Sequence, residues 1–115
     1  MFEISKRFRF EAAHSLPHLP EGHKCRRVHG HSYEFDVVCR GDVDGRGFVI
    51  DYAEISEAVE PIVAMVDHQN LNELFSFYTT AEMLAKWIYD QLQGQIPVSH
   101  ILFYETKKTS VRYPA

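Results

Sequence analysis

A chain of 115 residues has room for one domain with a modest hydrophobic core, and we expect residues 1–115 to form that domain. Hydrophobic residues make up 45% and charged residues 24% of the chain, values typical of a soluble globular protein rather than a disordered or fibrous one. The formal net charge of -4 argues against nucleic-acid binding, and no apolar run is long enough to span a membrane, so the sequence predicts a cytoplasmic protein.

The first part of the chain predicts two strands. Residues 2–10 alternate apolar and polar side chains, with Lys6 the single exception, and this pattern is typical of a half-buried antiparallel strand. Continuing the same parity places His14 on the apolar side, just before a loop rich in Pro and Gly. A second strand is predicted from about residue 31 to the turn at 44–47.

Two helices are expected after residue 50, where the apolar residues change from alternation to helical spacing. The first covers about 52–66, and Pro61 is expected to kink or shorten it. The second begins at about Thr80 and ends before Gly94. The two predicted capping boxes are Asp51 with Glu54 and Thr79 with Glu82.

Two further strands, over 101–106 and 111–113, complete the order strand, strand, helix, helix, strand, strand. This order predicts an α+β domain in which two helices pack on one face of a four-stranded antiparallel sheet. Long edge strands on a small sheet tend to pair with other chains, so we also expect a homo-oligomer.

Three of the seven histidines gather around one of the two cysteines. His29 and His31 lie two positions apart on an extended segment and therefore face the same side, while His14 ends the preceding strand. Zinc is well bound by neutral imidazoles, and a site with three protein ligands keeps a fourth position open, as catalytic sites require. Any one of these histidines could be merely structural, but the three together predict a Zn²⁺ site.

Cys25 stands in a positively charged loop, next to Lys24, Arg26 and Arg27. A positive field favours the thiolate form, which can act as a general base. The alternative is that Cys25 is a fourth ligand that closes a structural zinc site. Cys39, on the core parity of its strand, is expected to be buried and inert, and we expect both cysteines to be free thiols.

Two other segments contain candidate functional residues. Asp67 and His68 could form a proton shuttle in which the carboxylate orients the imidazole, or they could simply end a helix. Glu105 shares the parity of Ile101 and Phe103, so we expect it on the apolar side of its strand, where an unpaired carboxylate is costly. Its partner would be a cationic side chain or a ligand with two adjacent N–H groups. The histidines assigned to surface or loop positions are His18, His23 and His100.

Five segments in chain order carry a resemblance to a known family. They are Phe10-Glu11-Ala12-Ala13-His14, Cys25-Arg26-Arg27-Val28-His29-Gly30-His31, Asp67-His68 with Leu71-Asn72, Thr79-Thr80-Ala81-Glu82, and Glu105-Thr106. The chain resembles, nearly end to end, the family of 6-pyruvoyltetrahydropterin and 6-carboxytetrahydropterin synthases. The three-residue gap between Cys25 and His29 resembles the bacterial carboxytetrahydropterin branch. One departure is Tyr78-Thr79, where bacterial relatives commonly carry Asn-Pro.

The resemblance implies the tunnelling fold (T-fold), in which trimers join their sheets into a barrel, two trimers stack into a hexamer, and sites lie at subunit interfaces. It implies conversion of 7,8-dihydroneopterin triphosphate to 6-carboxy-5,6,7,8-tetrahydropterin, acetaldehyde and triphosphate, on the route to queuosine and related deazapurines. Two alternatives are kept. One is a 6-pyruvoyltetrahydropterin synthase, which eliminates triphosphate without cleaving the carbon chain, and the other is a non-catalytic zinc-binding module.

The resemblance also assigns roles to residues. Cys25 would remove a proton from the substrate side chain, and His68, oriented by Asp67, would move protons on the opposite face. The residues that would hold zinc are His14, His29 and His31. The residues that would hold the pterin are Glu105, Thr79 and Thr80, with a bidentate contact from the glutamate. The candidates for triphosphate contacts are Lys24, Arg26 and Arg27.

Overall fold

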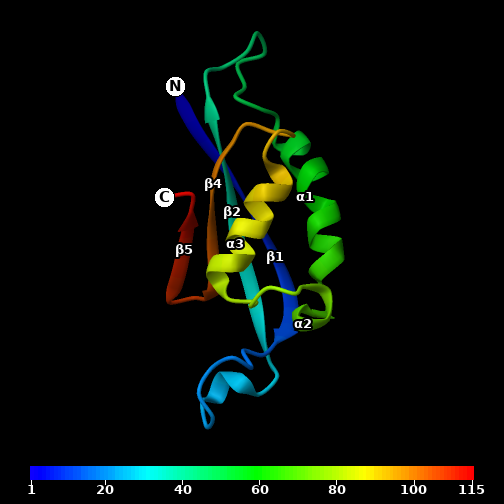
Figure 1. Cartoon of the computed structure of the whole chain (residues 1–115). Helices are drawn as coiled ribbons and strands as arrows, with labels where there is room; N and C mark the ends of the chain where they lie inside the picture. Colours follow the sequence, from blue (N-terminus) through cyan, green and yellow to red (C-terminus); the bar gives the residue numbers. More distant parts are fainter.

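Two long strands form the centre of the sheet in a computed structural model that describes residues 1–115 (Figure 1). β1 (Phe2–His14) and β2 (His29–Gly41) pair antiparallel over their whole length, so that His14 lies opposite His29. The alternation predicted from the sequence is present, and its exception has a structural reason. Lys6 lies on the helix side of β1 and donates a hydrogen bond to Ser56 Oγ at 2.5 Å.

The sheet has five strands in the order β3-β1-β2-β4-β5. β4 (Val98–Thr106) pairs with β2 and β5 (Thr109–Tyr113) pairs with β4, both antiparallel, which gives the four antiparallel strands expected. The additional strand is β3 (Gln69–Asn70), which runs parallel to β1 and pairs with its last residues. Because β3 is parallel to β1, the sheet is mixed rather than purely antiparallel. A strand of two residues has no periodicity that a sequence could reveal, which is why it was not predicted.

The helices α1 (Tyr52–Val66), α2 (Leu71–Leu74) and α3 (Ala81–Leu92) cover one face of the sheet (Figure 1). The side chain of Asp51 caps α1 and accepts a hydrogen bond from the backbone N–H of Ala53 at 2.9 Å, at the predicted start. Of the two expected effects of Pro61, a kink or a shorter helix, the shortening does not occur, since α1 continues to Val66. None of the helices has the length and apolar character needed to cross a membrane.

The hydrophobic core lies between the sheet and the helices. Its largest fully buried side chains from the sheet are Tyr33, Phe35 and Phe103, and the helices add Ile55 and Leu84. Burial of side chains of this size stabilises the fold by about 1.5–3 kcal/mol each. At the end of β1 the core gives way to His14, which is as deeply buried as its apolar neighbours, with 1% of its surface exposed.

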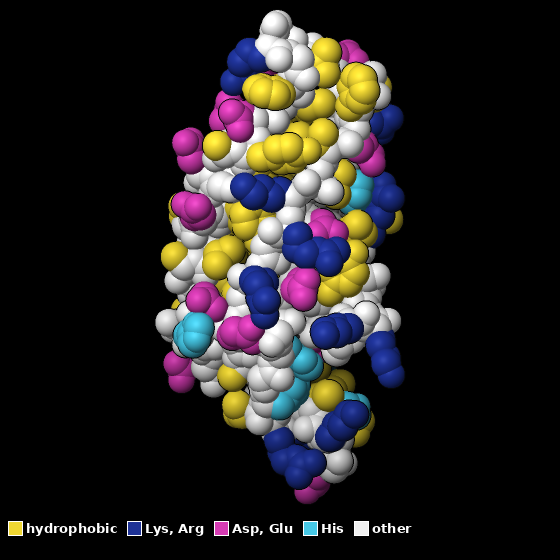
Figure 2. All heavy atoms as spheres, turned by 180° about the vertical axis from the view of Figure 1, so that it is seen from behind, with side chains coloured by type: hydrophobic (Ala, Val, Ile, Leu, Met, Phe, Trp, Pro, Cys, Tyr) yellow, Lys and Arg dark blue, Asp and Glu magenta, His cyan; other side chains and the backbone are white.

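The opposite face of the sheet carries interleaved charges (Figure 2). Arg7 on β1 pairs with Asp36 on β2, with Nε and Oδ1 2.7 Å apart, and Arg9 lies 3.3 Å from Glu11. Histidine side chains gather toward the lower end of this face, below the charged rows (Figure 2). The sheet therefore separates an apolar helical side from a polar open side, and the candidate site lies at one end of it.

Candidate active site

Three histidines converge where β1 ends and β2 begins. His14 is the last residue of β1, His29 is the first residue of β2 opposite it, and His31 lies two residues further along β2. One ring nitrogen of each lies within 4.8 Å of the others, and the ring centroids are 4.6, 4.9 and 5.2 Å apart. The strand register thus brings together the three side chains that the sequence selected.

Backbone carbonyl groups orient two of these rings. His14 Nδ1 donates a hydrogen bond to the Thr79 carbonyl oxygen at 2.9 Å, and His29 Nδ1 donates to the Arg27 carbonyl oxygen at 2.8 Å. A proton held at Nδ1 leaves the lone pair of Nε2 free for a metal ion. The Nε2 atoms of His14 and His31 are buried and have no hydrogen-bond partner in the chain. These residues fit a bound metal ion, which would satisfy the buried nitrogens.

The protonation of the cluster also suits a metal. Burial lowers the pKa of His14 to about 4, against the smaller opposing effect of its hydrogen bond to Thr79. Burial likewise lowers the pKa of His31, although the nearby Glu105 carboxylate opposes the shift. Both rings are therefore neutral at neutral pH, and the neutral imidazole is the form that binds a metal.

Glu105 on β4 faces the same cluster. Its carboxylate oxygens lie 3.8 Å from His31 Nε2 and 4.0 Å from His14 Nε2, and no Lys or Arg forms an ion pair with them. The cationic partner considered from the sequence is therefore absent. Glu105 and His31 both line a cleft of about 720 Å³ on the open side of the sheet. A space of this size accommodates a small metabolite.

Tyr33 is a neighbour of the cluster that the sequence analysis did not select. Its ring lies beneath His31, with centroids 5.3 Å apart, and its buried hydroxyl has no partner in the chain. Burial raises the pKa of Tyr33, and the charge of Glu105 adds to the effect, so the phenol stays protonated. Tyr33 stands inside a strand and belongs to none of the sequence motifs, so only the structure shows that its ring lies next to the histidines.

Cys25 lies in a short 3-10 helix, η1 (Lys24–Arg26), within the loop 15–28 that joins β1 to β2. The thiol is free and partly exposed. Its sulfur is not among the mutually close ligand atoms, which comprise the three histidines alone. The Cys25 carbonyl oxygen accepts a hydrogen bond from the Leu16 N–H at 2.7 Å, which closes the base of the loop. This geometry argues against Cys25 as a fourth ligand that closes the site.

Asp67 and His68 form the predicted pair. His68 Nδ1 lies 3.0 Å from Asp67 Oδ2, and His68 has a left-handed backbone conformation with φ of 59°. Both residues are attached to β1, since Asp67 Oδ1 accepts from the Glu11 N–H at 2.9 Å and the His68 N–H donates to the Glu11 carbonyl at 2.6 Å. These bonds, first that from Glu11 and then that from His68, lower the pKa of Asp67. The Asp67 carboxylate therefore stays ionised near neutral pH and can orient the imidazole ring of His68.

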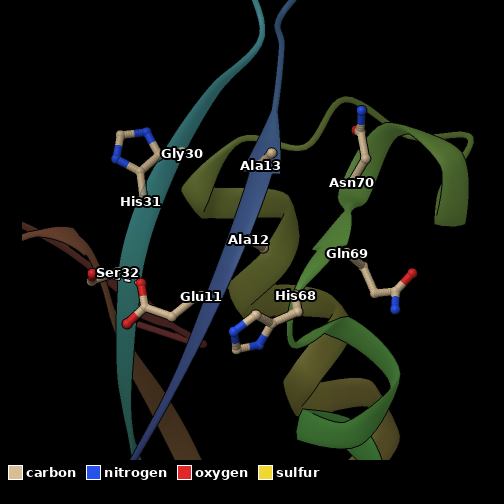
Figure 3. A pocket seen from close by; sticks show the side chains of 9 residues that line it. All are labelled: Glu11, Ala12, Ala13, Gly30, His31, Ser32, His68, Gln69 and Asn70. Carbon is tan, nitrogen blue, oxygen red and sulfur yellow. Dashed lines mark hydrogen bonds between the residues drawn. The ribbon is translucent and has the colours of Figure 1, made fainter.

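The pair lies apart from the histidine cluster within one chain. His68 and His31 lie on either side of β1 (Figure 3). Both nevertheless line a shallow cavity of about 590 Å³ that passes over β1 and includes Gln69 and Asn70. Within one chain, His31 and the Asp67-His68 pair thus lie along one surface without coming into contact.

Thr79 and Thr80 have structural contacts that the sequence did not predict. Thr79 is fully buried, and besides its carbonyl contact its Oγ1 lies 3.1 Å from His14 Nδ1. The hydroxyl of Thr80, rather than that of Thr79, caps α3 and accepts from the Met83 N–H at 3.3 Å. The predicted capping box was therefore one residue out of place, because the Thr79 side chain points inward to His14. Substrate contacts by either threonine stay a prediction.

Predictions were also made for two side chains outside the site, Cys39 and His100. Cys39 is fully buried and free, as predicted, and burial raises its pKa to about 11. His100 was expected at the surface, and this was wrong. It lies on β4 with 4% of its surface exposed, and its Nδ1 is 3.0 Å from Ser99 Oγ. A bulge in the pairing of β2 with β4 next to His100 breaks the simple alternation there.

The contact between Thr79 and His14 leads to a prediction. Thr79→Val keeps the shape and the backbone carbonyl but removes the hydroxyl beside Nδ1, so we expect zinc affinity to fall about tenfold. Competition against a chromogenic chelator measures this directly. The matched control is Thr80→Val, which should cost roughly 1 kcal/mol of stability through the lost cap and leave zinc affinity unchanged. Equal affinity in the Thr79→Val and wild-type proteins would contradict the assignment.

Comparison with known proteins identifies the family of the chain. The profile of the family described as 6-pyruvoyl tetrahydropterin synthase matches residues 3–115. The chain belongs to this family of enzymes. The match covers both strands that carry the three histidines, the Asp67-His68 pair and Glu105.

Individual members of the 6-pyruvoyl tetrahydropterin synthase family are similar over nearly the whole chain. A protein of Synechocystis named 6-carboxy-5,6,7,8-tetrahydropterin synthase is 37% identical over 98% of this chain and 93% of its own length. A Haemophilus influenzae protein of the same name is 32% identical over 98% of this chain and 99% of its own length.

A solved structure supports the fold. The structure of Caenorhabditis elegans 6-pyruvoyl tetrahydropterin synthase superposes with a TM-score of 0.88 at 27% identity, covering 97% of this chain and 94% of that one. The T-fold predicted for the single chain is therefore confirmed. The relatives of this family carry both the carboxy and the pyruvoyl names, so the comparison shows the family and leaves the individual reaction to be argued from the site.

Proposed function

We propose that the chain is a zinc-dependent 6-carboxy-5,6,7,8-tetrahydropterin synthase. It would convert 7,8-dihydroneopterin triphosphate to 6-carboxy-5,6,7,8-tetrahydropterin, acetaldehyde and triphosphate, on the route to queuosine and related deazapurines. The observation that carries the proposal is the cluster of three converging histidines beside an open cleft, with two buried ring nitrogens that lack partners. The similarity over nearly the full length of two relatives with this name supports the branch.

In this proposal His14, His29 and His31 hold the zinc ion, which supplies Lewis acidity toward the hydroxyl groups of the substrate side chain. Cys25 is the general base that takes a proton from a carbon of the substrate side chain, from a loop that also carries Lys24 and Arg26. Tyr33 and the aromatic core beneath the cluster keep water from its inner side.

His68 is the second proton carrier. Asp67 accepts the Nδ1–H, so the opposite nitrogen, Nε2, is the one that gives and takes a proton. Since His68 and His31 lie on either side of β1 in one chain, we infer that the complete site combines side chains from neighbouring subunits (Figure 3). The corresponding assembly is a homohexamer made of two trimers whose sheets join into a barrel, in keeping with the exposed edge strands.

Glu105 is the proposed anchor for the pterin. Its carboxylate lacks a Lys or Arg partner, and two parallel N–H groups on the amidine-like edge of a pterin would satisfy both oxygens. We expect Glu105→Gln to raise KM about tenfold to a hundredfold, because a charge-assisted pair becomes a weaker and mismatched one. Steady-state kinetics measure this, and metal analysis should show an unchanged zinc content. The control is Glu60→Gln, at an exposed position on α1. A wild-type KM in Glu105→Gln would remove the residue from the pterin site.

The reaction itself is tested by its products. The purified protein, loaded with zinc and mixed with 7,8-dihydroneopterin triphosphate, should release acetaldehyde and triphosphate in equal amounts. Release of triphosphate without acetaldehyde would identify a 6-pyruvoyltetrahydropterin synthase instead. Zinc binding without consumption of the substrate would favour the non-catalytic module.

A further inference from the structure

The loop that carries Cys25 has few bonds to the rest of the chain. It spans residues 15–28 and is attached at both ends to histidines of the cluster, His14 and His29. At its base, Ser15 exchanges hydrogen bonds with the Asn72 side chain at 2.7 and 2.9 Å. The hydrogen bonds of residues 16–27 stay within the loop or run to His29. They shape the loop but do not hold its tip against the fold.

An aromatic contact joins the loop to the segment before α3. The ring of His18 stacks on the ring of Tyr78, with centroids 3.7 Å apart and planes inclined by 20°. Tyr78 is followed by Thr79, whose carbonyl and hydroxyl hold the ring of His14. Two adjacent residues therefore contact the cysteine loop on one side and a metal-site histidine on the other.

We propose that Tyr78 is a positioning residue, and that its stacking on His18 fixes the loop so that Cys25 keeps its place relative to the three histidines. The inference rests on the proposed function, in which Cys25 removes a proton from the substrate. A stacked pair of this kind shifts an equilibrium by roughly twofold to tenfold. The stack therefore sets the fraction of molecules in which the loop is docked, and the enzyme is active in that fraction.

The test measures the reactivity of Cys25 in the zinc-loaded protein. Iodoacetamide alkylates exposed thiols, and Cys39 is fully buried, so the native protein reports on Cys25 alone. We expect Tyr78→Ala and His18→Ala each to raise the alkylation rate twofold to tenfold and to lower kcat by a similar factor, with zinc content unchanged. The double variant should show no larger effect than either single one, since both remove the same contact.

Two further variants separate the stack from a general effect of substitution. Tyr78→Phe keeps the ring and should retain the wild-type alkylation rate and kcat. Tyr52→Ala removes another exposed tyrosine, at the start of α1, and should leave both quantities unchanged. If Tyr78→Ala and Tyr78→Phe are alkylated at the same rate and have the same kcat, the proposal is wrong.

Failure of the proposed function would look different. If Cys25→Ala retains full turnover, the thiol is not the base, and the catalytic part of the inference is lost with it. The alkylation rates do not depend on the reaction, so a wild-type rate in Tyr78→Ala would overturn the docking of the loop whether or not Cys25 is catalytic.

Discussion

Replacing His29 with alanine should remove stable zinc binding and lower kcat/KM about a thousandfold. Loss of one of three protein ligands leaves two imidazoles, and the several kcal/mol of charge stabilisation that a catalytic metal provides corresponds to a factor of that order. His29 is the best probe of the cluster, because it is half-buried while His14 is deeply buried, so its loss disturbs the fold least.

Metal analysis after dialysis, together with steady-state kinetics, measures both effects in His29→Ala. The matched control is Val28→Ala, at the neighbouring residue, whose side chain is exposed. This control should bind zinc and turn over substrate as the wild type does. One equivalent of zinc retained by His29→Ala with wild-type affinity would show that the cluster is not the metal site.

Cys25→Ala should keep one equivalent of zinc and lose turnover by about a hundredfold to ten-thousandfold, the usual contribution of a general base. The reason is geometric, since the sulfur does not belong to the group of convergent ligand atoms and so removal of the thiol leaves the three histidines in place. Zinc content by mass spectrometry and initial rates decide the outcome in a single preparation.

The opposite result has an equally clear meaning. If Cys25→Ala loses zinc together with activity, the sulfur is a ligand and the site is closed, as in a structural zinc site. Cys25→Ser is the companion variant, because a hydroxyl keeps the size and polarity of the side chain but is a poor base. It should retain zinc and remain nearly as inactive as the alanine variant.

The candidate site at the ends of β1 and β2 combines residues on strands with residues on connecting segments. The strands fix the histidines to the backbone register, so the metal candidates need no loop to define them. Cys25 and the proposed proton shuttle of Asp67 and His68 instead come from connecting segments, the loop 15–28 and the turn after α1. Such segments can adjust to a substrate while the strand ends stay fixed.

The sequence alone determined which face the histidines at the ends of β1 and β2 occupy. Alternation along β1 carried His14 to the buried side, and the two-residue spacing of His29 and His31 placed both on one side of β2, because successive side chains of a strand point to opposite faces. Helical spacing located α1 and α3 for the same reason of local geometry. These features depend on neighbours in the chain and can be read from them.

The tertiary structure decided which distant polar groups meet. Thr79 lies 65 residues from His14, yet its carbonyl and hydroxyl hold that ring, and Glu105 approaches the same cluster from β4. β3 and α2 are too short to leave a periodic signal, and the stacking of His18 on Tyr78 joins two exposed side chains that no pattern connects. Such contacts follow from strand register and helix placement, which local periodicity does not encode, so they emerge when the chain is folded.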